Sequence, residues 1–466
     1  MARPVSEWTV LTSTSLAVVA VFLDTSILFV AFPSISASFS DVSTTTMSWV
    51  LNAYTIVFAA LLIPAGRLAD RIGRRKTFLT AVVIFTVASV LCGLAPTAGL
   101  LILGRILQAV GAAALVPSSL ALVLQTFPRP KIPMAVAIWG SIGAVAGAAG
   151  PTIGALVVEN FGWRWAFFIN VPVGIVSFVM GRRVLPEGRE AHPGRLPDPL
   201  GVVLLASGLA LLAYGIVKTA DWGWTSVEFI GCTVIAVGLL AVFIHRCRVV
   251  PNPLLELSLF RVRNFRWANA AAFVFAIGFN AMFLGNILFF TMVWQFSILE
   301  AGLAIGLGPL IVALTAPWFG KLAGHIGQRA LLIPGGLVFA TGGAMLLARM
   351  GTTPSYVTEF LPALLFTAVG VALCLPQLSS AAVQGLPPDR YGAGSATTQA
   401  VRNLGATIGV AIVIAFVAGA TGGQLEDFRR VWWLLVVCGV MISLLSTQLT
   451  PGAPASAHPD PVPAAA

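Results

Sequence analysis

Charged residues are scarce in this chain. Asp, Glu, Lys and Arg make up 9% of its 466 residues, whereas they make up about a quarter of an average soluble domain. Hydrophobic residues make up 58%. Because a soluble fold cannot hide that much apolar surface, the composition excludes an ordinary soluble protein. It indicates that the lipid bilayer is the solvent of most of the chain.

Residues that carry catalytic chemistry are equally scarce. The five cysteines have neither metal-ligand nor disulfide spacing, so the plain interpretation is that they are small buried hydrophobic residues. The four histidines fall in loops, in the tail or at segment ends. The sequence has no nucleophile–base constellation and no Gly-Lys-Ser/Thr phosphate loop. We therefore expect no enzyme, no metal site and no direct use of ATP.

Basic residues exceed acidic ones and give a net charge of +10. These basic residues lie in short gaps between apolar segments, as the positive-inside rule predicts for a membrane protein. We therefore expect the lipid bilayer as a partner and no nucleic acid. No cleavable signal peptide is recognisable, and the first apolar segment is long enough to act as its own insertion signal.

Fourteen apolar segments have the length of about 20 residues that a helix needs to cross a bilayer. They are residues 9–32, 47–66, 77–95, 98–124, 134–158, 164–181, 199–219, 227–246, 267–290, 301–320, 331–349, 357–380, 397–419 and 431–449. The sequence therefore predicts an all-α integral membrane protein with 14 transmembrane helices. Residues 450–466 are rich in Pro and Ala and predict a disordered tail.

The distribution of Lys and Arg predicts the orientation of these helices. If both termini are cytoplasmic, 20 basic residues lie on the inside and 5 on the outside, and two more, Arg105 and Arg402, lie within spans. An excess of that size over short loops is a strong orientation signal. We expect a monomeric, multi-pass protein of the cytoplasmic (inner) membrane with both termini cytoplasmic.

A charged stretch occurs twice and indicates two related halves. Residues 66–76 read GRLADRIGRRK and residues 320–330 read GKLAGHIGQRA, with six of eleven positions identical at an offset of 254 residues. Each copy follows the second span of its half, which predicts two six-helix bundles with an inserted helix pair between them. The expected units are an N-terminal bundle (1–181), cytoplasmic linkers with inserted helices 7 and 8 (182–266), and a C-terminal bundle (267–449).

Two charges lie deep within predicted spans. Asp24 stands about 15 residues into the first span, where a carboxylate costs roughly 2.5–3.5 kcal/mol. Low dielectric favours its protonated form, as a proton-coupled carrier requires; the alternative is a structural Asp paired with a base. Arg105 in the fourth span must also face the protein interior, where it either assists Asp24 or is a fixed structural residue.

Glycines recur in the fifth span at Gly140, Gly143, Gly147, Gly150 and Gly154. Their spacings of three and four residues place all five on one helix face, where a neighbouring helix approaches closely. Pro151 favours a bend beside this face. The stripe predicts either a specialised hinge or seal, or ordinary helix packing.

Polar and aromatic residues within spans are candidates for lining a substrate cavity. They are Thr25, Asn52, Tyr54, Gln108, Trp139, Asn280, Asn286, Trp294 and Gln295. Such groups suit an amphipathic or cationic organic molecule through hydrogen bonds and cation–π contacts; the alternative for the tryptophans is the interfacial aromatic belt. Arg402 is interpreted either as a snorkelling residue or as a cavity charge.

Several of these motifs resemble signatures of the major facilitator superfamily. The stretch Gly66–Lys76 resembles its loop 2–3 motif, Arg105 with Gln108 its helix-4 motif, and residues 147–154 (GAAGPTIG) its helix-5 antiporter motif. Residues 23–33 (LDTSILFVAFP) and 163–174 (WRWAFFINVPVG) resemble the fourteen-helix drug:proton antiporter branch. The resemblance covers nearly the whole chain.

This resemblance implies proton-driven efflux of drugs or antibiotic-like molecules, without any cofactor other than the proton gradient. It implies that Asp24 is the coupling acid and that Arg105 assists proton movement. It also implies that the first charged stretch is a conformational gate, in which Asp70 and Arg74 latch helix ends. The gating residues carried over are Gly66, Asp70, Arg71, Gly73, Arg74, Arg75, Gly147, Gly150, Pro151 and Gly154.

Other functions remain open at this point. The same fold transports other cargoes, such as a lipid, a siderophore or an amino acid, and a membrane sensor that has lost transport is a further alternative. The second charged stretch has Gly324 where the first has Asp70, and Gln328 where the first has Arg74. We therefore expect the first copy to act as the gate and the second to be mainly a structural relic.

Overall fold

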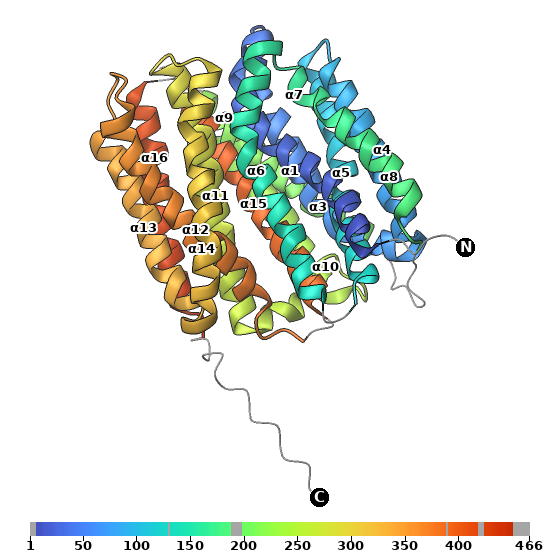
Figure 1. Cartoon of the computed structure of the whole chain (residues 1–466). Helices are drawn as coiled ribbons and strands as arrows, with labels where there is room; N and C mark the ends of the chain where they lie inside the picture. Colours follow the sequence, from blue (N-terminus) through green and yellow to red (C-terminus); the bar gives the residue numbers. More distant parts are fainter. Residues whose placement is uncertain (1–5, 129–130, 188–197, 388–389, 418–423, 451–466) are drawn as a thin grey trace, which may run out of the picture.

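The computed structural model of the protein describes residues 6–128, 131–187, 198–387, 390–417 and 424–450, and within these residues every regular element is a helix (Figure 1). The predicted tail at 450–466 lies outside the described residues, apart from Thr450. In Figure 1 the helices of the first half, in blue to green, lie mostly on the right. Those of the second half, in yellow to red, lie mostly on the left.

Each of the fourteen predicted spans overlaps a long helix or a broken helix pair. The elements are α1 (Glu7–Ser38), α2 (Thr44–Met47), α3 (Trp49–Ile72), α4 (Arg74–Gly93), α5 (Ala98–Thr126), α6 (Ile132–Phe161), α7 (Trp165–Phe168), α8 (Asn170–Val184), α9 (Pro199–Trp222), α10 (Val227–Val249), η2 (Leu257–Arg261), α11 (Arg263–Met292), α12 (Ile298–Ile326), α13 (Gln328–Arg349), η3 (Tyr356–Phe360), α14 (Leu361–Val383), α15 (Tyr391–Val417) and α16 (Leu425–Ser446). The prediction of an all-helical membrane protein is confirmed.

Helix α6 is bent where the sequence predicts a bend. Thirteen helices of the described chain are long and apolar enough to cross a membrane, and α6 becomes the fourteenth when its two segments, bent by 40° between Gly147 and Ala149, count as one span. The ring of Pro151 clashes with the carbonyl of the residue four positions earlier, which is Gly147, and it removes one helix hydrogen bond. Pro151 is therefore the cause of the bend.

The two charged stretches fold into the same kind of turn. Gly73 joins α3 to α4 with φ 118°, and Gly327 joins α12 to α13 with φ 83°. Both values lie in the left-handed region, which glycine reaches without the steric cost that a Cβ atom imposes. Each stretch thus ends one long helix and starts the next within a single residue, which is why the glycine is common to both copies.

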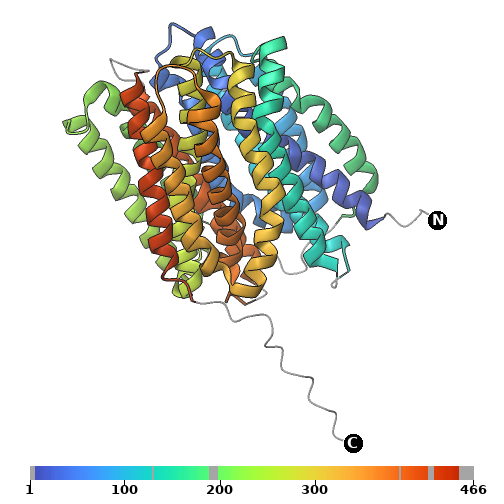
Figure 2. The same ribbon diagram turned by 60° about the vertical axis from the view of Figure 1, so that its left-hand side comes forward.

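The helices pack in two groups. Helices α1, α3, α4, α5, α6 and α8 pack against one another, and so do α11 to α16. Helices α9 and α10 pack mainly on each other, α9 also contacts α3 and α15, and Figure 2 shows α10 in yellow-green at the edge of the molecule. That α9 and α10 are an inserted pair stays a prediction, as do the unit boundaries.

The described residues show contact between the two halves at one end of the bundle. We call the end that carries Gly66–Lys76 the basic end. At the other end, which we call the opposite end, Gly302 of α12 lies against Ala155 and the Pro151 carbonyl of α6, and a Thr55–Thr407 hydrogen bond of 2.8 Å joins α3 to α15. Toward the basic end, a Cβ added at Gly140 or Gly320 would find no described atom within 4 Å. The halves are therefore closed together at the opposite end and apart at the basic end between α6 and α12.

Asp198 fastens the ends of α9 and α10 together. Arg246 of α10 donates to both of its carboxylate oxygens, at 2.7 and 2.9 Å, and the backbone N–H groups of Leu200 and Gly201 donate to the same carboxylate as it caps α9. The bidentate hydrogen bonds from Arg246 hold the pKa of the Asp198 carboxyl below its ordinary value.

We expect Asp198→Ala to lower the Tm of the detergent-purified protein by a few degrees, because it removes both the helix cap and the ion pair. Asp198→Asn should lower Tm less, since its amide oxygen still caps α9. A group whose folded pKa is lowered stabilises the fold above its unfolded pKa and loses that contribution as pH falls through the folded pKa. The difference between wild type and Asp198→Ala should therefore be full at neutral pH and shrink only in acid. Exposed Asp221→Asn is the control, and equal melting of wild type and Asp198→Ala at neutral pH would contradict this role.

Candidate functional site

Among the charged residues that the structure describes, Asp24 in the middle of α1 is the most buried. Its side chain is 0% exposed and accepts three hydrogen bonds. Arg105 Nη1 donates to Oδ2 at 2.6 Å, while Gln108 Nε2 and Asn170 Nδ2 each donate to Oδ1 at 2.8 Å. Both oxygens are thus engaged, and all three neighbours are N–H donors. The Asp24 carboxylate is thus a hydrogen-bond acceptor at both oxygens in this structure.

Arg105 is held from several sides. Its Nε donates to the Val50 carbonyl of α3 at 3.0 Å, and its Nη1 also donates to the amide oxygen of Gln108. The guanidinium carbon lies 4.0 Å from the centre of the Tyr54 ring, a cation–π distance. With 1% of its side chain exposed, Arg105 is a fully enclosed partner of Asp24.

Close packing of α5 against α4 completes this cluster. A Cβ at Gly111 of α5 would lie 2.7 Å from the Phe85 backbone of α4, so the two helices touch there. The contact brings Ser89 of α4 within 2.8 Å of Gln108, whose Nε2 donates to its hydroxyl. Because Arg105 and Gln108 are three residues apart on α5, one helix face presents both to Asp24.

The cluster lies inside the N-terminal group of helices. Its members come from α1, α3, α4, α5 and α8, all of which pack in that group. The structure therefore brings Asp24 and Arg105 together as a buried ion pair, which the sequence left open as one alternative. A change of charge on either residue here is costly, since it leaves the other charge buried without compensation.

Four polar side-chain atoms on the helices of this cluster have no hydrogen-bond partner among the described residues. They are the Tyr54 hydroxyl, the Asn170 side-chain oxygen and both polar atoms of Asn52, which is 1% exposed. Buried polar groups are nearly always paired, so unpaired ones call for a functional or solvent explanation. These groups, next to an ionisable pair, are suited to hold a water molecule or a transferred proton.

Two members of the cluster were not among the predicted residues. Asn170 is the one strongly polar residue in the apolar run 165–176, which is a signal that the sequence offered. Ser89 offered no comparable signal, because serines are common in apolar spans.

The first charged stretch holds itself together locally. Arg74 Nε donates to Asp70 Oδ1 at 2.9 Å across the α3–α4 turn, and Arg75 Nη2 donates to the Arg182 carbonyl at the end of α8 at 2.6 Å. Gly66 lies close to Pro117 of α5, and Arg71 is exposed. The stretch is thus anchored to its own half in this structure, while its role as a gate stays a prediction.

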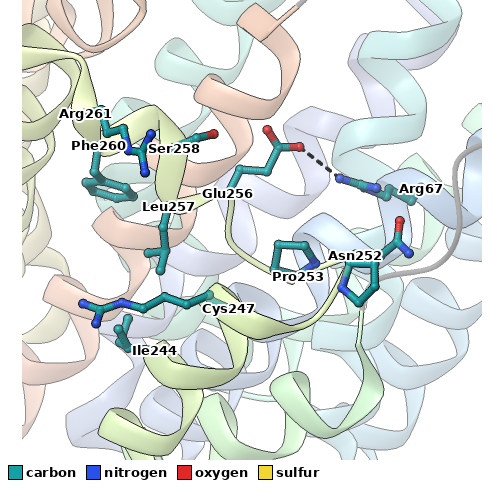
Figure 3. Close-up of a pocket in the computed structure, with 12 residues that line it drawn as sticks. Arg67, Ile244, Cys247, Asn252, Pro253, Glu256, Leu257, Ser258, Phe260 and Arg261 are labelled. Carbon is teal, nitrogen blue, oxygen red and sulfur yellow. Dashed lines mark hydrogen bonds and ion pairs between the residues drawn. The ribbon is translucent and has the colours of Figure 1, made fainter.

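Arg67 of the same stretch reaches the linker between α10 and α11. Its Nη2 lies 3.2 Å from Glu256 Oε1, as the dashed line in Figure 3 shows. The pair borders a cavity of about 910 Å³ at the basic end, also lined by Arg248, Arg261 and Phe260. Glu256 was not among the predicted residues, and it links α3 to the segment that leads into the second half.

The glycine stripe of α6 faces α1 for most of its length. A Cβ at Gly150 would overlap the Ser26 side chain, one at Gly154 would press on Ile27, and one at Gly143 would lie 3.1 Å from the Phe22 ring. A Cβ added at Gly140 or Gly147 would have no described atom within 4 Å. Three of the five glycines thus serve tight packing of α6 on α1.

The remaining candidates are dispersed. Trp139 donates to the Ser119 hydroxyl at 3.2 Å, and Asn280 donates to the Ala276 carbonyl of its own helix at 2.8 Å. Trp294 donates to the Gly351 carbonyl at 3.0 Å and packs among aromatic rings of the second half. Thr25 is half-buried, and its hydroxyl donates a hydrogen bond to the Val21 carbonyl. Asn286 is buried, and Gln295 is exposed.

Comparisons with known proteins agree with this architecture. The family model described as Major Facilitator Superfamily matches residues 14–410. The chain is 33% identical over 417 residues to the multidrug resistance protein Stp of Mycobacterium tuberculosis, covering 89% of this chain and 77% of that protein. It is 31% identical over 432 residues to the tetracenomycin C resistance and export protein of Streptomyces glaucescens, covering 90% and 78%.

Solved structures share the fold. The crystal structure of a D-xylose-proton symporter superimposes with a TM-score of 0.71, covering 95% of this chain and 98% of that one. At 15% sequence identity, this similarity concerns the fold alone.

We expect Arg105→Gln to destabilise the protein by about 3–5 kcal/mol, because it leaves the Asp24 carboxylate buried without a counter-ion. The double variant Asp24→Asn/Arg105→Gln removes both charges and should recover most of that loss. Thermal unfolding in detergent measures the stability of the single and the double variant. Arg67→Gln, which breaks the half-exposed pair with Glu256, is the control and should cost about 0–1 kcal/mol. Equal destabilisation by the single and the double variant would contradict a charge-pair origin.

Proposed function

The chain belongs to the Major Facilitator Superfamily, and from this premise we propose that it is a proton-coupled exporter of drugs or antibiotic-like organic molecules. As a member of this family it is a membrane transporter of small organic substrates and not an enzyme. Relatives named for multidrug resistance and for tetracenomycin C export support efflux as its direction. Proton coupling and antiport are our inference from the site.

The observation that carries the proposal is the Asp24–Arg105 pair with its complete set of donors. A proton that reaches Asp24 removes its negative charge and weakens its bond to Arg105. Arg105 keeps its contacts with Val50 and Tyr54 of α3, so the change releases α1 in particular. An ionisable group inside a membrane bundle is costly, and proton relay is the use that accounts for that cost.

Release of α1 offers a route from the proton to the cargo path. Ser26 and Ile27, just after Asp24, pack on Gly150 and Gly154 of α6. Helix α6 in turn contacts α12 of the second half at Gly302. A shift of α1 therefore acts on the contact that closes the opposite end. We propose that the ionised pair belongs to this conformation and that protonation favours opening at the opposite end.

The membrane orientation follows from the charges. We propose that the basic end is cytoplasmic, because 20 of the basic residues then lie inside and 5 outside. The conformation described here is then open toward the cytoplasm, ready to accept cargo for export. The monomeric state and the cytoplasmic membrane location are parts of the same proposal.

We expect Asp24→Asn to reduce export of tetracenomycin C at least tenfold, because an amide cannot take up and release a proton. Export is measured as uptake of the drug into inside-out vesicles of an expression strain, with and without an imposed proton gradient. The control is Asp41→Asn, which neutralises an exposed acid between α1 and α2. Gradient-driven transport that survives in Asp24→Asn would refute the coupling role. Loss of transport on ATP depletion at a fixed gradient would refute the energy source.

We expect neutralisation of the first charged stretch to impair turnover more than a change in its repeat. Asp70→Asn removes the ion pair with Arg74 and should slow export several-fold. Gly324→Ala is the matched change at the equivalent position, where an added Cβ meets no described atom within 4 Å. It should leave export within a factor of two in the same vesicles. Equal effects of the two variants would remove the basis for a gate in the first copy.

A further inference from the structure

Arg402 is a cation within α15 that has no partner among the described residues. It lies about three turns from the start of a helix of 27 residues. The structure gives it no hydrogen bond, ion pair or ring contact with any described residue, and its side chain is half-buried. Arg105, the other arginine within a span, has a carboxylate, an amide, a carbonyl and an aromatic ring around it.

An uncompensated guanidinium in this position requires an explanation. Charged residues within membrane spans face the protein interior or a water-filled cavity and mark substrate or ion paths. Asp24 and Arg105 cancel each other's charge, so Arg402 leaves the interior of the described spans with one positive charge in excess. The group that balances it must come from outside the described chain.

Two helix contacts fix the direction in which Arg402 points. Gly405 and Gly409 bring α15 against the backbone of α11, where a Cβ would meet the carbonyls of Phe273 and Ile277. Thr407 faces α3 through its hydrogen bond with Thr55. On the helical wheel, Arg402 and Asn403 fall in the arc between these two contacts. The opposite arc of the helix carries the apolar residues Val401, Leu404 and Ile408.

The solvent exposure of the residues along this arc shows from which end of the bundle a solute can reach it. Ser395, nearest the basic end, is exposed, and Gln399 and Arg402 are half-buried. Farther along, Ala406 is 8% exposed and Val410 1%. The arc is therefore open toward the basic end and closed beyond Arg402, where the halves meet.

A second donor lies beside Arg402. The side-chain nitrogen of Asn403 is buried and has no hydrogen-bond partner among the described residues. An amide nitrogen and a guanidinium together offer donors that suit an oxygen anion. Closer to the opposite end, the half-buried rings of Phe279 and Phe283 of α11 and the ring of Phe29 of α1 add an aromatic wall, with Phe29 and Phe283 6.2 Å apart.

We propose that Arg402, with Asn403, binds the anionic group of the transported molecule. The substrate class is then an aromatic organic anion, such as a phenolate or carboxylate, which enters from the basic end. This inference rests on the proposed export function and specifies its cargo. It reverses the expectation of a cationic substrate, which the aromatic residues alone suggested.

Binding of two xanthene dyes tests this proposal. Fluorescein is an anion and rhodamine 123 a cation, and they share the same ring system. Fluorescence anisotropy measures their binding to the protein in phosphatidylcholine nanodiscs, without any gradient. Arg402→Gln should weaken fluorescein binding by roughly tenfold or more, the loss of a charge-assisted hydrogen bond, and leave rhodamine 123 binding within a factor of two. Arg402→Lys should keep part of the fluorescein affinity.

The control is Arg429→Gln, which removes an equal charge from an exposed pair with Glu426 at the opposite end. It should not alter the binding of either dye. An equal loss of both dyes in Arg402→Gln, an unchanged fluorescein affinity, or no fluorescein binding by the wild type would overturn the proposal.

Thermal unfolding separates binding from a structural role. Because Arg402 has no described partner to lose, Arg402→Gln should melt at or above the wild-type Tm in the absence of dye. A fall in Tm shared by Arg402→Gln and Arg402→Lys would make Arg402 structural and overturn the proposal. Dye binding needs no proton gradient, so failure of gradient-driven export with intact dye selectivity would refute the proposed function and leave this site standing.

Discussion

The buried ion pair between Asp24 and Arg105 is the interaction on which the N-terminal half depends. Two charges 2.6 Å apart, with 0% and 1% of their side chains exposed, have lost nearly all their hydration. Their mutual attraction offsets that loss only if the remaining donors and acceptors are also satisfied. Gln108, Asn170 and the Val50 carbonyl do so. The pair is thus stable as a set, and a change to one charge affects every helix that contributes to it.

In the proposed mechanism, the same set explains how a local proton transfer acts over a distance. Asp24 belongs to α1, whereas Arg105 is fixed to α3 through Val50 and Tyr54. Loss of the pair therefore removes the ionic link of α1 to Arg105 of α5 and, through Arg105, to α3. Helix α1 continues into its packing on the glycines of α6 and into the Phe29–Phe283 contact with α11. A small movement of α1 consequently reaches two of the contacts between the halves, the α6–α12 contact and the α1–α11 contact.

The sequence predicts much of the fold because apolar length and charge position follow directly from the bilayer. The fourteen apolar segments correspond to long helices, and the repeated glycines predict the turns at Gly73 and Gly327. The arrangement of the site was harder to predict from the sequence. Asp24 and Arg105 are 81 residues apart and Asn170 is 146 residues from Asp24, and helix periodicity carries no information about which faces meet across such separations. Glu256, in a linker without periodicity, was unpredictable for the same reason.

The two charged stretches are similar in sequence, yet the two halves carry their internal charges in different places. The position in the second half equivalent to Asp24 is Gly278, where a Cβ would lie 2.9 Å from Cys438 and 3.3 Å from the Phe339 ring. No carboxylate fits there, so the second half cannot hold an internal pair at that site. Arg402, a charge well inside α15, stands instead on the α15 face between α3 and α11, without a partner among the described residues. A charge that is balanced by an internal partner is suited to respond to protonation. An unbalanced charge that faces the other half is suited to bind a ligand. In the proposed mechanism, this asymmetry places the proton in one half and the cargo's anionic group in the other, with α1 and α6 as the connection between them.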